Sequence, residues 1–306
     1  MFGSAIGLLA FPRLARRWGR RMRPCDWARL SVLALIAGAA GLEVSLALIG
    51  LPTALKAFGV SGLVVACRRV FGELAPGGSI VGWSAAVSAA LLPLATTVAW
   101  RRAAATAAGM QVESWLGEHK ARGDVKVVLL PTDATIAYCV ARPTQQVVLS
   151  QGLRDRLVPD HLEAVVRHEL SHLRHRHATL LVAANAAVRV LPVLRPSTKS
   201  LRDAFERWAD EDAAASGPRA RAAVHDALAR VAATLAVEPV VAAFANVDTL
   251  VDRLDALAAA PPVPSFAGWF STHAALGGAA AVAAPALGAW VVEARMMASL
   301  VGFCRM

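Results

Sequence analysis

The hydrophobic positions of this chain gather in long uninterrupted runs, separated by segments of mixed polarity. Residues 30–51 and 80–100 are each long enough to cross a hydrocarbon core of about 30 Å at a helical rise of about 1.5 Å per residue. Residues 269–292 form a third candidate span, although alanine and glycine make it weakly hydrophobic. Residues 1–11 are too short to cross, so we expect a short interfacial helix or the end of a truncated first span.

Between the second and third runs the pattern is that of a folded domain. Short segments rich in β-branched residues predict the strands of a small antiparallel sheet, at 125–130, 135–140 and 146–150. The segments that follow predict helices at about 160–177, 178–194, 201–216, 218–236 and 247–259. The second of these helices is apolar and is expected to be buried or membrane-apposed. The expected fold is therefore mainly α-helical, with several membrane helices joined to a small α+β domain.

The composition supports a membrane location. Hydrophobic residues make up 56% of the 306 residues and charged residues 18%, against about 45–50% and about 25% in soluble globular chains. The formal charge of +10 lies beside the apolar runs without a recognition motif, so nucleic-acid binding is not expected. Four scattered cysteines without a CxxC pair exclude a disulfide framework.

The arginines define an expected orientation. Seven of them crowd a basic loop at residues 12–29, before the first full span, and two more follow the second span. Because Lys and Arg accumulate on the cytoplasmic side, both flanks should be cytoplasmic. The expected organisation in the plasma membrane is an N-terminal membrane region (1–102), a cytoplasmic domain (103–267), and a last span with a short external tail (268–306).

The most specific chemical signal is the motif HELSH, which begins at His168 in a segment expected to form a helix. Asp160 is the expected N-cap of that helix, with Glu163 three residues on. Two histidines four residues apart project from one face of a helix and can bind one zinc ion. His168 and His172 are therefore predicted ligands, and Glu169 between them is the predicted catalytic base that takes a proton from water at the metal.

A catalytic zinc needs a third protein ligand and an open position. A third histidine of the HExxHxxGxxH type is excluded, because His175 and Ala178 occupy the positions of its Gly and His. We expect the ligand to be Glu206 on a later helix, with Asp210 one turn on, accepting a hydrogen bond from a ligating histidine. Two alternatives stay open: His175, on the face of the first two ligands, and Glu211, next to Asp210.

These residues resemble the BlaR/MecR-type membrane metallopeptidases, the antirepressor family of β-lactam signalling. The order of parts matches: a basic cytoplasmic loop, a span, an external loop, a span, an HExxH domain and a further span. The run QVVLSQGL at 146–153 is similar to the strand that leads into the family's zinc helix. The resemblance implies His168, His172 and Glu206 as ligands and Glu169 as the catalytic glutamate.

The resemblance to that family has one clear departure. BlaR and MecR proteins carry a penicillin-binding sensor domain after the last span, and this sequence does not contain one. The related HtpX and CAAX-prenyl proteases share the HExxH…ExxxD arrangement of gluzincins but place their spans differently around it. They are the alternative family, and either relationship implies an α+β zincin domain.

The expected function is that of an integral-membrane zinc metalloendopeptidase with one Zn²⁺ ion, hydrolysing a protein or peptide substrate on the cytoplasmic side. Glu169 would activate water and then protonate the leaving amine. The family resemblance implies a transcriptional repressor as substrate in regulated signalling. The alternatives are an HtpX-like quality-control protease and a non-catalytic, zinc-stabilised signalling scaffold, which would not need Glu169. The sequence does not decide between a monomer and a homo-oligomer.

Overall fold

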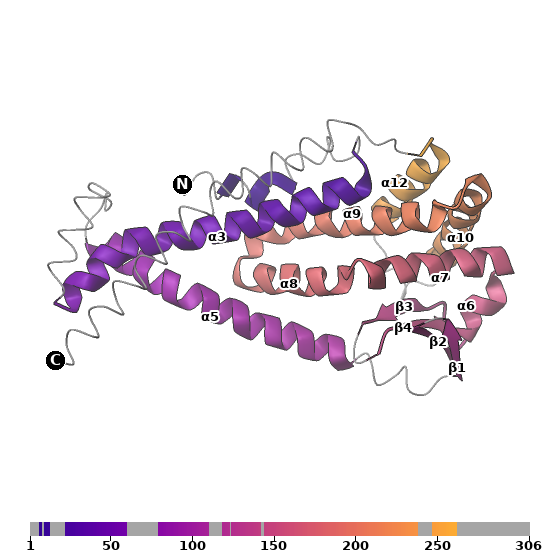
Figure 1. The fold of residues 1–306 in the computed structure, drawn as a ribbon, viewed down its shortest axis with the longest axis horizontal. Coiled ribbons are helices and arrows are strands. Elements are labelled where there is room, and N and C mark those ends of the chain that lie inside the picture. Colours follow the sequence, from indigo (N-terminus) through magenta and orange to yellow (C-terminus); the bar gives the residue numbers. More distant parts are fainter. Residues whose placement is uncertain are drawn as a thin grey trace.

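The computed structural model describes residues 6–7, 9–12, 22–59, 79–109, 118–122, 124–141, 144–237 and 247–261. The described part is mainly helical with one small sheet, as the sequence predicts (Figure 1). Its main elements, in chain order, are α3 (Pro24–Ala57), α5 (Ser79–Gly109), β1 (Glu118–Arg122), β2 (Val125–Leu130), β3 (Ala137–Val140), β4 (Gln146–Ser150), α6 (Gln151–Arg156), α7 (Pro159–Arg174), α8 (His177–Val190), η2 (Pro192–Leu194), α9 (Arg195–Ala214), α10 (Pro218–Val237) and α12 (Val247–Ala258).

Within these residues, α3 and α5 are the two helices long and apolar enough to cross a membrane. They contain the predicted spans 30–51 and 80–100 and continue beyond them at both ends. In particular, α3 begins inside the segment 12–29 that was expected to be a loop, because Pro24 can occupy the first helical turn without losing a hydrogen bond. The third predicted span, 269–292, lies outside the described residues.

α3 and α5 form a V that is closed at one end and open toward the rest of the chain (Figure 1). At the closed end Gly50 of α3 lies against Ala86 of α5, where an added Cβ would overlap backbone atoms of Ala86. Gly82 of α5 lies against Thr53 of α3, where an added Cβ would overlap the threonine side chain. Small residues allow two helix backbones to approach closely, which is a common way of packing helices in a membrane.

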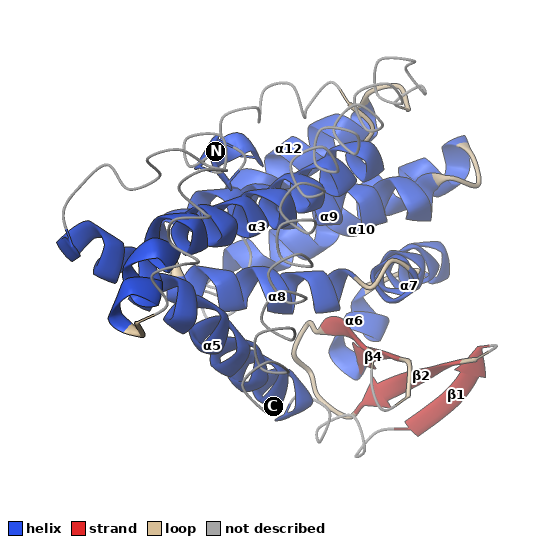
Figure 2. Cartoon of the chain, turned by 60° about the vertical axis from the view of Figure 1, so that its left-hand side comes forward, coloured by secondary structure: helices blue, strands red, loops and turns tan. Residues whose placement is uncertain are grey.

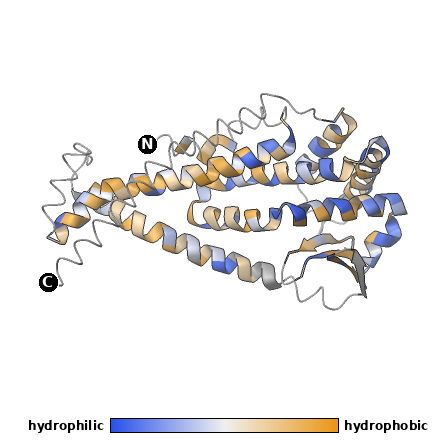
Figure 3. Ribbon diagram, in the orientation of Figure 1, coloured by the Kyte–Doolittle hydropathy of each residue, from blue (hydrophilic) through white to orange (hydrophobic). Residues whose placement is uncertain are grey.

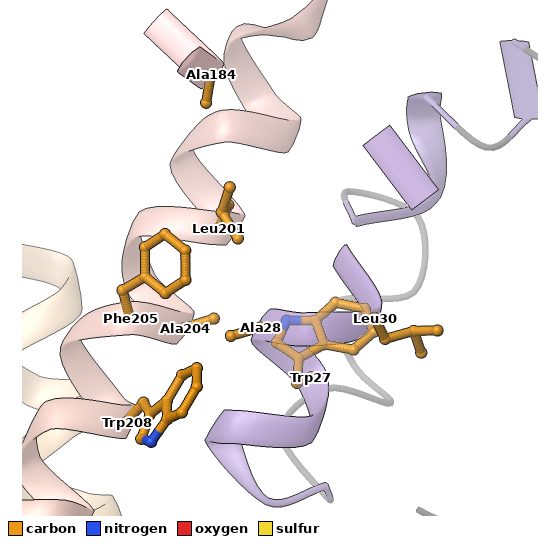
Figure 4. Packing of buried hydrophobic residues seen from close by; sticks show 8 residues of the cluster. All are labelled: Trp27, Ala28, Leu30, Ala184, Leu201, Ala204, Phe205 and Trp208. Atoms are coloured by element: carbon orange, nitrogen blue, oxygen red, sulfur yellow. The ribbon is translucent and has the colours of Figure 1, made fainter. Parts of the chain in front are cut away.

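The open end of the V is filled by α8, which packs on α5, and by α9, which packs on α3 (Figures 1 and 2). A buried cluster joins the three helices α3, α8 and α9 (Figure 4), and its members are Trp27, Ala28, Leu30, Ala184, Leu201, Ala204, Phe205 and Trp208. The first turns of α3 therefore belong to the protein core that supports the domain, although the sequence pattern placed them at the edge of a membrane region.

The sheet has the strand order β1-β2-β4-β3 and is mixed, so the prediction of an antiparallel sheet was wrong. β4 inserts between β2 and β3, runs parallel to β2 and pairs antiparallel with β3. All five residues of β4 are buried, because the strand is central and both of its faces are covered. A continuous apolar run of this kind, without alternation, is typical of parallel pairing.

α7 packs on the sheet through an apolar cluster that includes Val166 and Val147. The predicted N-cap, Asp160, is not the cap: Pro159 occupies the first helical position, and the Asp160 carboxylate accepts a hydrogen bond from Arg219 instead. The helix ends three residues earlier than predicted, because Arg176 adopts a left-handed conformation with φ 55° and interrupts it before α8 begins.

The close packing of α3 against α5 can be tested by a substitution at Gly50. Gly50→Ala should destabilise the protein by about 1–3 kcal/mol, because the added methyl group has no room against the backbone of Ala86. Gly7→Ala is the matched control, since an added Cβ there meets nothing within 4 Å. Thermal unfolding of the full chain in detergent measures both, and equal stability of the two variants would contradict this packing.

Candidate metal centre

The candidate site lies where α7 packs against α9. Asp212 of α9 fixes the two helices relative to each other: Ser171 Oγ donates a hydrogen bond of 2.9 Å to its Oδ2, and His175 Nε2 lies 2.8 Å from the same oxygen. One and a half turns earlier on α9, Glu206 then faces the turn of α7 that carries the motif histidines.

The structure brings the three predicted ligands together. His168 Nε2 lies 3.1 Å from His172 Nε2, and the Glu206 carboxylate oxygens lie 3.5 Å and 3.6 Å from these two nitrogens. Tetrahedral ligands at about 2.0–2.1 Å from a zinc ion are about 3.3–3.4 Å apart. Each imidazole nitrogen thus lies close to this spacing from a different oxygen of Glu206, and one ligand atom from each of the three residues lies within 4.8 Å of the others. Two imidazoles with one carboxylate are a donor set found in catalytic zinc sites.

The outer nitrogen of each histidine also has a partner. His168 Nδ1 lies 2.9 Å from Asp210 Oδ1, and His172 Nδ1 lies 2.8 Å from His177 Nδ1. A partner that accepts a hydrogen bond from Nδ1 leaves the Nε2 lone pair free for a metal and fixes the orientation of the ring. His177 is itself fully buried and stacked on Phe205, with 4.3 Å between the ring centroids.

Sequence reasoning missed His177. In a continuous helix, a residue five positions beyond His172 does not share its face. The left-handed Arg176 interrupts the helix between them and returns His177 to the site. The sequence shows several histidines after the motif, but their spacing does not indicate that His177 contacts His172.

Sequence reasoning also missed Arg253 of α12. Its Nε and Nη2 donate hydrogen bonds of 2.7 Å and 2.8 Å to the two carboxylate oxygens of Asp210. Its Nη1 lies 3.1 Å from Glu206 Oε2. A bidentate arginine of this kind holds a carboxylate in a fixed plane. Nothing in the local sequence separates Arg253 from a surface arginine, so only the fold reveals the contact.

The surrounding charges set the ionisation of the site. Burial opposes protonation of His168, but the carboxylates of Asp210 and Glu206 outweigh it and raise its pKa to about 10. Burial lowers the pKa of His172 to about 4. Although burial opposes their ionisation, Arg253 holds the pKa of Asp210 at about 2 and the pKa of Glu206 well below its usual range. A metal ion that binds here replaces the proton of His168, and the two anionic carboxylates and the neutral imidazole of His172 favour such a cation.

Glu169 lies on the wall of a cavity of about 340 Å³ that His168 and Glu206 also line. Burial raises the pKa of the Glu169 carboxyl group, and a raised pKa suits a general base working near neutral pH. The same cavity has an apolar wall from α7, α10 and α12, which includes Val165, Val224, Leu228, Val231 and Leu250.

The two alternative ligands are engaged elsewhere. His175 contacts Asp212 and packs on Trp208, with 4.2 Å between the ring centroids. Glu211 forms an ion pair of 2.7 Å with Arg221. Within the described residues, only His168, His172 and Glu206 have the spacing of a metal site.

Comparison with known proteins adds an independent indication of chemistry. Residues 116–194 match the model of peptidase family M48. The match contains the sheet, α7 and both histidines, but it ends before Glu206. Over 62 residues the chain is 40% identical to a protein of Moorella thermoacetica described as "Protease HtpX homolog".

The similarity is local. It covers 20% of this chain and 21% of the relative, so the chain spans about a fifth of the length of that protein. No solved structure matches the chain. The M48 match and the HtpX homologue support a metallopeptidase of HtpX-like type, whereas neither match names the BlaR or MecR proteins, and that narrower resemblance stays a prediction.

The assignment of the ligands can be tested by measuring the zinc content of variants. His168→Ala, His172→Ala or Glu206→Ala should each lose tightly bound zinc, because each removes one of three donors. His175→Ala and Glu211→Ala, the controls, should keep it. Mass-spectrometric metal analysis of the purified variants measures this, and zinc retained by Glu206→Ala but lost from Glu211→Ala would reverse the assignment.

His177 can be tested without disturbing its packing. His177→Phe keeps an aromatic ring against Phe205 but removes the acceptor for His172 Nδ1. Outer contacts of this kind contribute about 10- to 100-fold to metal affinity, so zinc should bind that much more weakly. Competition with a chelator measures the affinity, and His225→Phe is the control, because that half-buried ring contacts Asp226 and none of the ligands. Unchanged affinity in His177→Phe would show that the contact is only structural.

Proposed function

We propose that this chain is an integral-membrane zinc metalloendopeptidase that hydrolyses peptide bonds in a protein substrate. The observation that carries the proposal is the spacing of His168 Nε2, His172 Nε2 and the Glu206 carboxylate, 3.1–3.6 Å apart beside a cavity that also contains Glu169. The local match to peptidase family M48 supports the same chemistry.

The roles of the residues follow from their contacts. His168, His172 and Glu206 would hold one zinc ion, which supplies a Lewis acid that lowers the pKa of water and polarises a carbonyl group. Asp210 and Arg253 hold His168 and Glu206 in place. The Glu169 carboxylate takes a proton from the attacking water and then passes it to the leaving amine, so one residue serves both steps.

The substrate would lie along the edge of the sheet. β3 is an edge strand, paired on one side with β4, and Ala137 at its start lines the cavity beside Glu169. An extended peptide can add to such an edge through main-chain hydrogen bonds, independently of its sequence. The apolar wall around Leu228 and Leu250 can then receive a hydrophobic side chain near the cleaved bond.

We propose that α3 and α5 cross the membrane and that the metal site lies on the cytoplasmic side. Hydrophobic residues dominate α3, α5 and α8 in Figure 3, whereas hydrophilic residues are frequent on α7. The outer face of α5 exposes Leu91, Leu94 and Val98, which a bilayer would cover. The two arginines that follow this span favour the cytoplasmic side for the end of α5.

The sequence resemblances suggest two substrate classes, a transcriptional repressor and proteins of membrane quality control. The structural basis described above, a sheet edge and an apolar wall, suits an extended segment of either class. We therefore propose that the substrate is a flexible segment of a protein, which either class could provide.

A variant of Glu169 can distinguish a protease from a zinc-stabilised scaffold, because a purely structural zinc site does not need this residue. Glu169→Gln should keep zinc and folding but lower the rate of proteolysis by about 10²- to 10⁴-fold, since the base is removed at constant size. Glu163→Gln, on the same helix and paired with Arg167, is the matched control. The assay follows cleavage of unfolded casein by the purified full chain, with zinc content measured in parallel.

Cleavage at equal rates by Glu169→Gln and the wild-type chain would favour the scaffold and contradict the proposed mechanism. Loss of zinc from Glu169→Gln would instead mean that this residue belongs to the metal ligands, which would contradict the assignment of Glu206 as the third ligand.

A further inference from the structure

The turn between α8 and α9 carries a group of basic side chains that the proposed chemistry does not use. Arg189 lies in the last turn of α8, and Arg195 and Lys199 lie one turn apart at the start of α9. All three are exposed, and none has an ion-pair partner among the described residues. They surround an exposed turn at Pro192, and we call these four residues the α8–α9 tip.

The helices that meet at the tip are apolar on their other sides. α8 is an apolar helix, too short to cross a bilayer, and it packs on the candidate span α5. α9 buries Leu201 against α3, the other candidate span. The tip is thus the end of a helical hairpin inserted between two candidate spans, and it points toward the closed end of their V (Figure 1).

The buried cluster limits how far the tip lies along α3. Leu30 of α3 and Ala184 of α8 belong to the same cluster, and both helices run from there toward the closed end of the V. At about 1.5 Å per residue, α8 continues for about 9 Å to Val190, whereas α3 continues for about 40 Å to Ala57. Because Ala184 lies nearer the tip than Leu30 does (Figure 4), α3 extends at most about 30 Å beyond the tip, a length comparable with the thickness of a hydrocarbon core.

We infer that the α8–α9 tip docks on anionic phospholipid headgroups, at the face of the bilayer where α3 and α5 enter it. This inference rests on the proposal that α3 and α5 span a membrane. It places three cations, which have no ion-pair partner in the part of the chain that the structure describes, at the level of the headgroups, where an anionic surface attracts Lys and Arg side chains. It also explains why the hairpin ends in a basic turn, since its packed faces lie against the spans and its charges face the lipid phosphates.

The position of the tip can be measured by photo-crosslinking of the full chain in nanodiscs. A benzoylphenylalanine in place of Pro192 should form an adduct with phospholipid, detected by mass spectrometry. The same group in place of Asp155, an exposed residue of α6 beside the sheet, should form none. Absence of a lipid adduct at position 192 would overturn the inference.

The charge of the tip can be tested in the same nanodiscs, made of phosphatidylcholine with phosphatidylglycerol. Each basic residue at an anionic surface strengthens binding by about fivefold, so Arg195→Gln with Lys199→Gln should lower the phosphatidylglycerol adduct by about 25-fold. Lys126→Gln with Arg219→Gln, two exposed cations away from the tip, should leave it unchanged. Equal loss in both double variants, or no loss in the first, would contradict a specific docking surface.

A failure of this inference can be told apart from a failure of the proposed function. Extraction of membranes with carbonate shows whether the chain is integral, and casein cleavage shows whether it is a protease. An integral and active protein without lipid adducts at position 192 would refute only the docking of the tip. A chain released by carbonate would refute both the spans and the docking.

Discussion

The site depends on the packing of α7 against α9, because neither helix alone carries a complete donor set. α7 supplies His168 and His172 from one face, and α9 supplies Glu206 from across the contact. The shared carboxylate of Asp212, which contacts Ser171 of α7 and His175 directly after it, holds the helices in the register that this requires. A small change in this register would separate the carboxylate from the imidazoles, so the contact has to be rigid.

The two histidines are supported by different chemistry. His168 contacts an anion, the carboxylate of Asp210, and the buried guanidinium of Arg253 balances the charge of that carboxylate. His172 contacts the imidazole ring of His177, which is neutral because burial lowers its pKa to about 3. The carboxylate–arginine pair therefore orients His168, and the neutral His177 orients His172 without adding a second buried negative charge, which would be costly so close to Glu206.

Local patterns in the sequence were enough to predict the helices of the domain except α6, the two described candidate spans, and the residues His168, Glu169, His172, Glu206 and Asp210 of the site. Hydrophobic periodicity and the spacing of HExxH are properties of single segments, so they can be recognised without knowing the fold. The direction of β4 and the contacts of His177 and Arg253 depend on chain crossings, on one left-handed residue at Arg176 and on a helix distant in sequence. None of these is encoded by spacing within one element.

The length of α8 has a consequence for where a substrate can be cut. This helix has 14 residues, or about 20 Å, and it separates the metal ligands from the end of the hairpin. With lipid headgroups at that end, a chain leaving the bilayer must cover the same distance before it reaches Glu169. An extended peptide advances about 3.3 Å per residue, so about six residues are used before the first accessible bond. α8 would thereby act as a ruler that protects the juxtamembrane residues of an anchored substrate and directs cleavage beyond them.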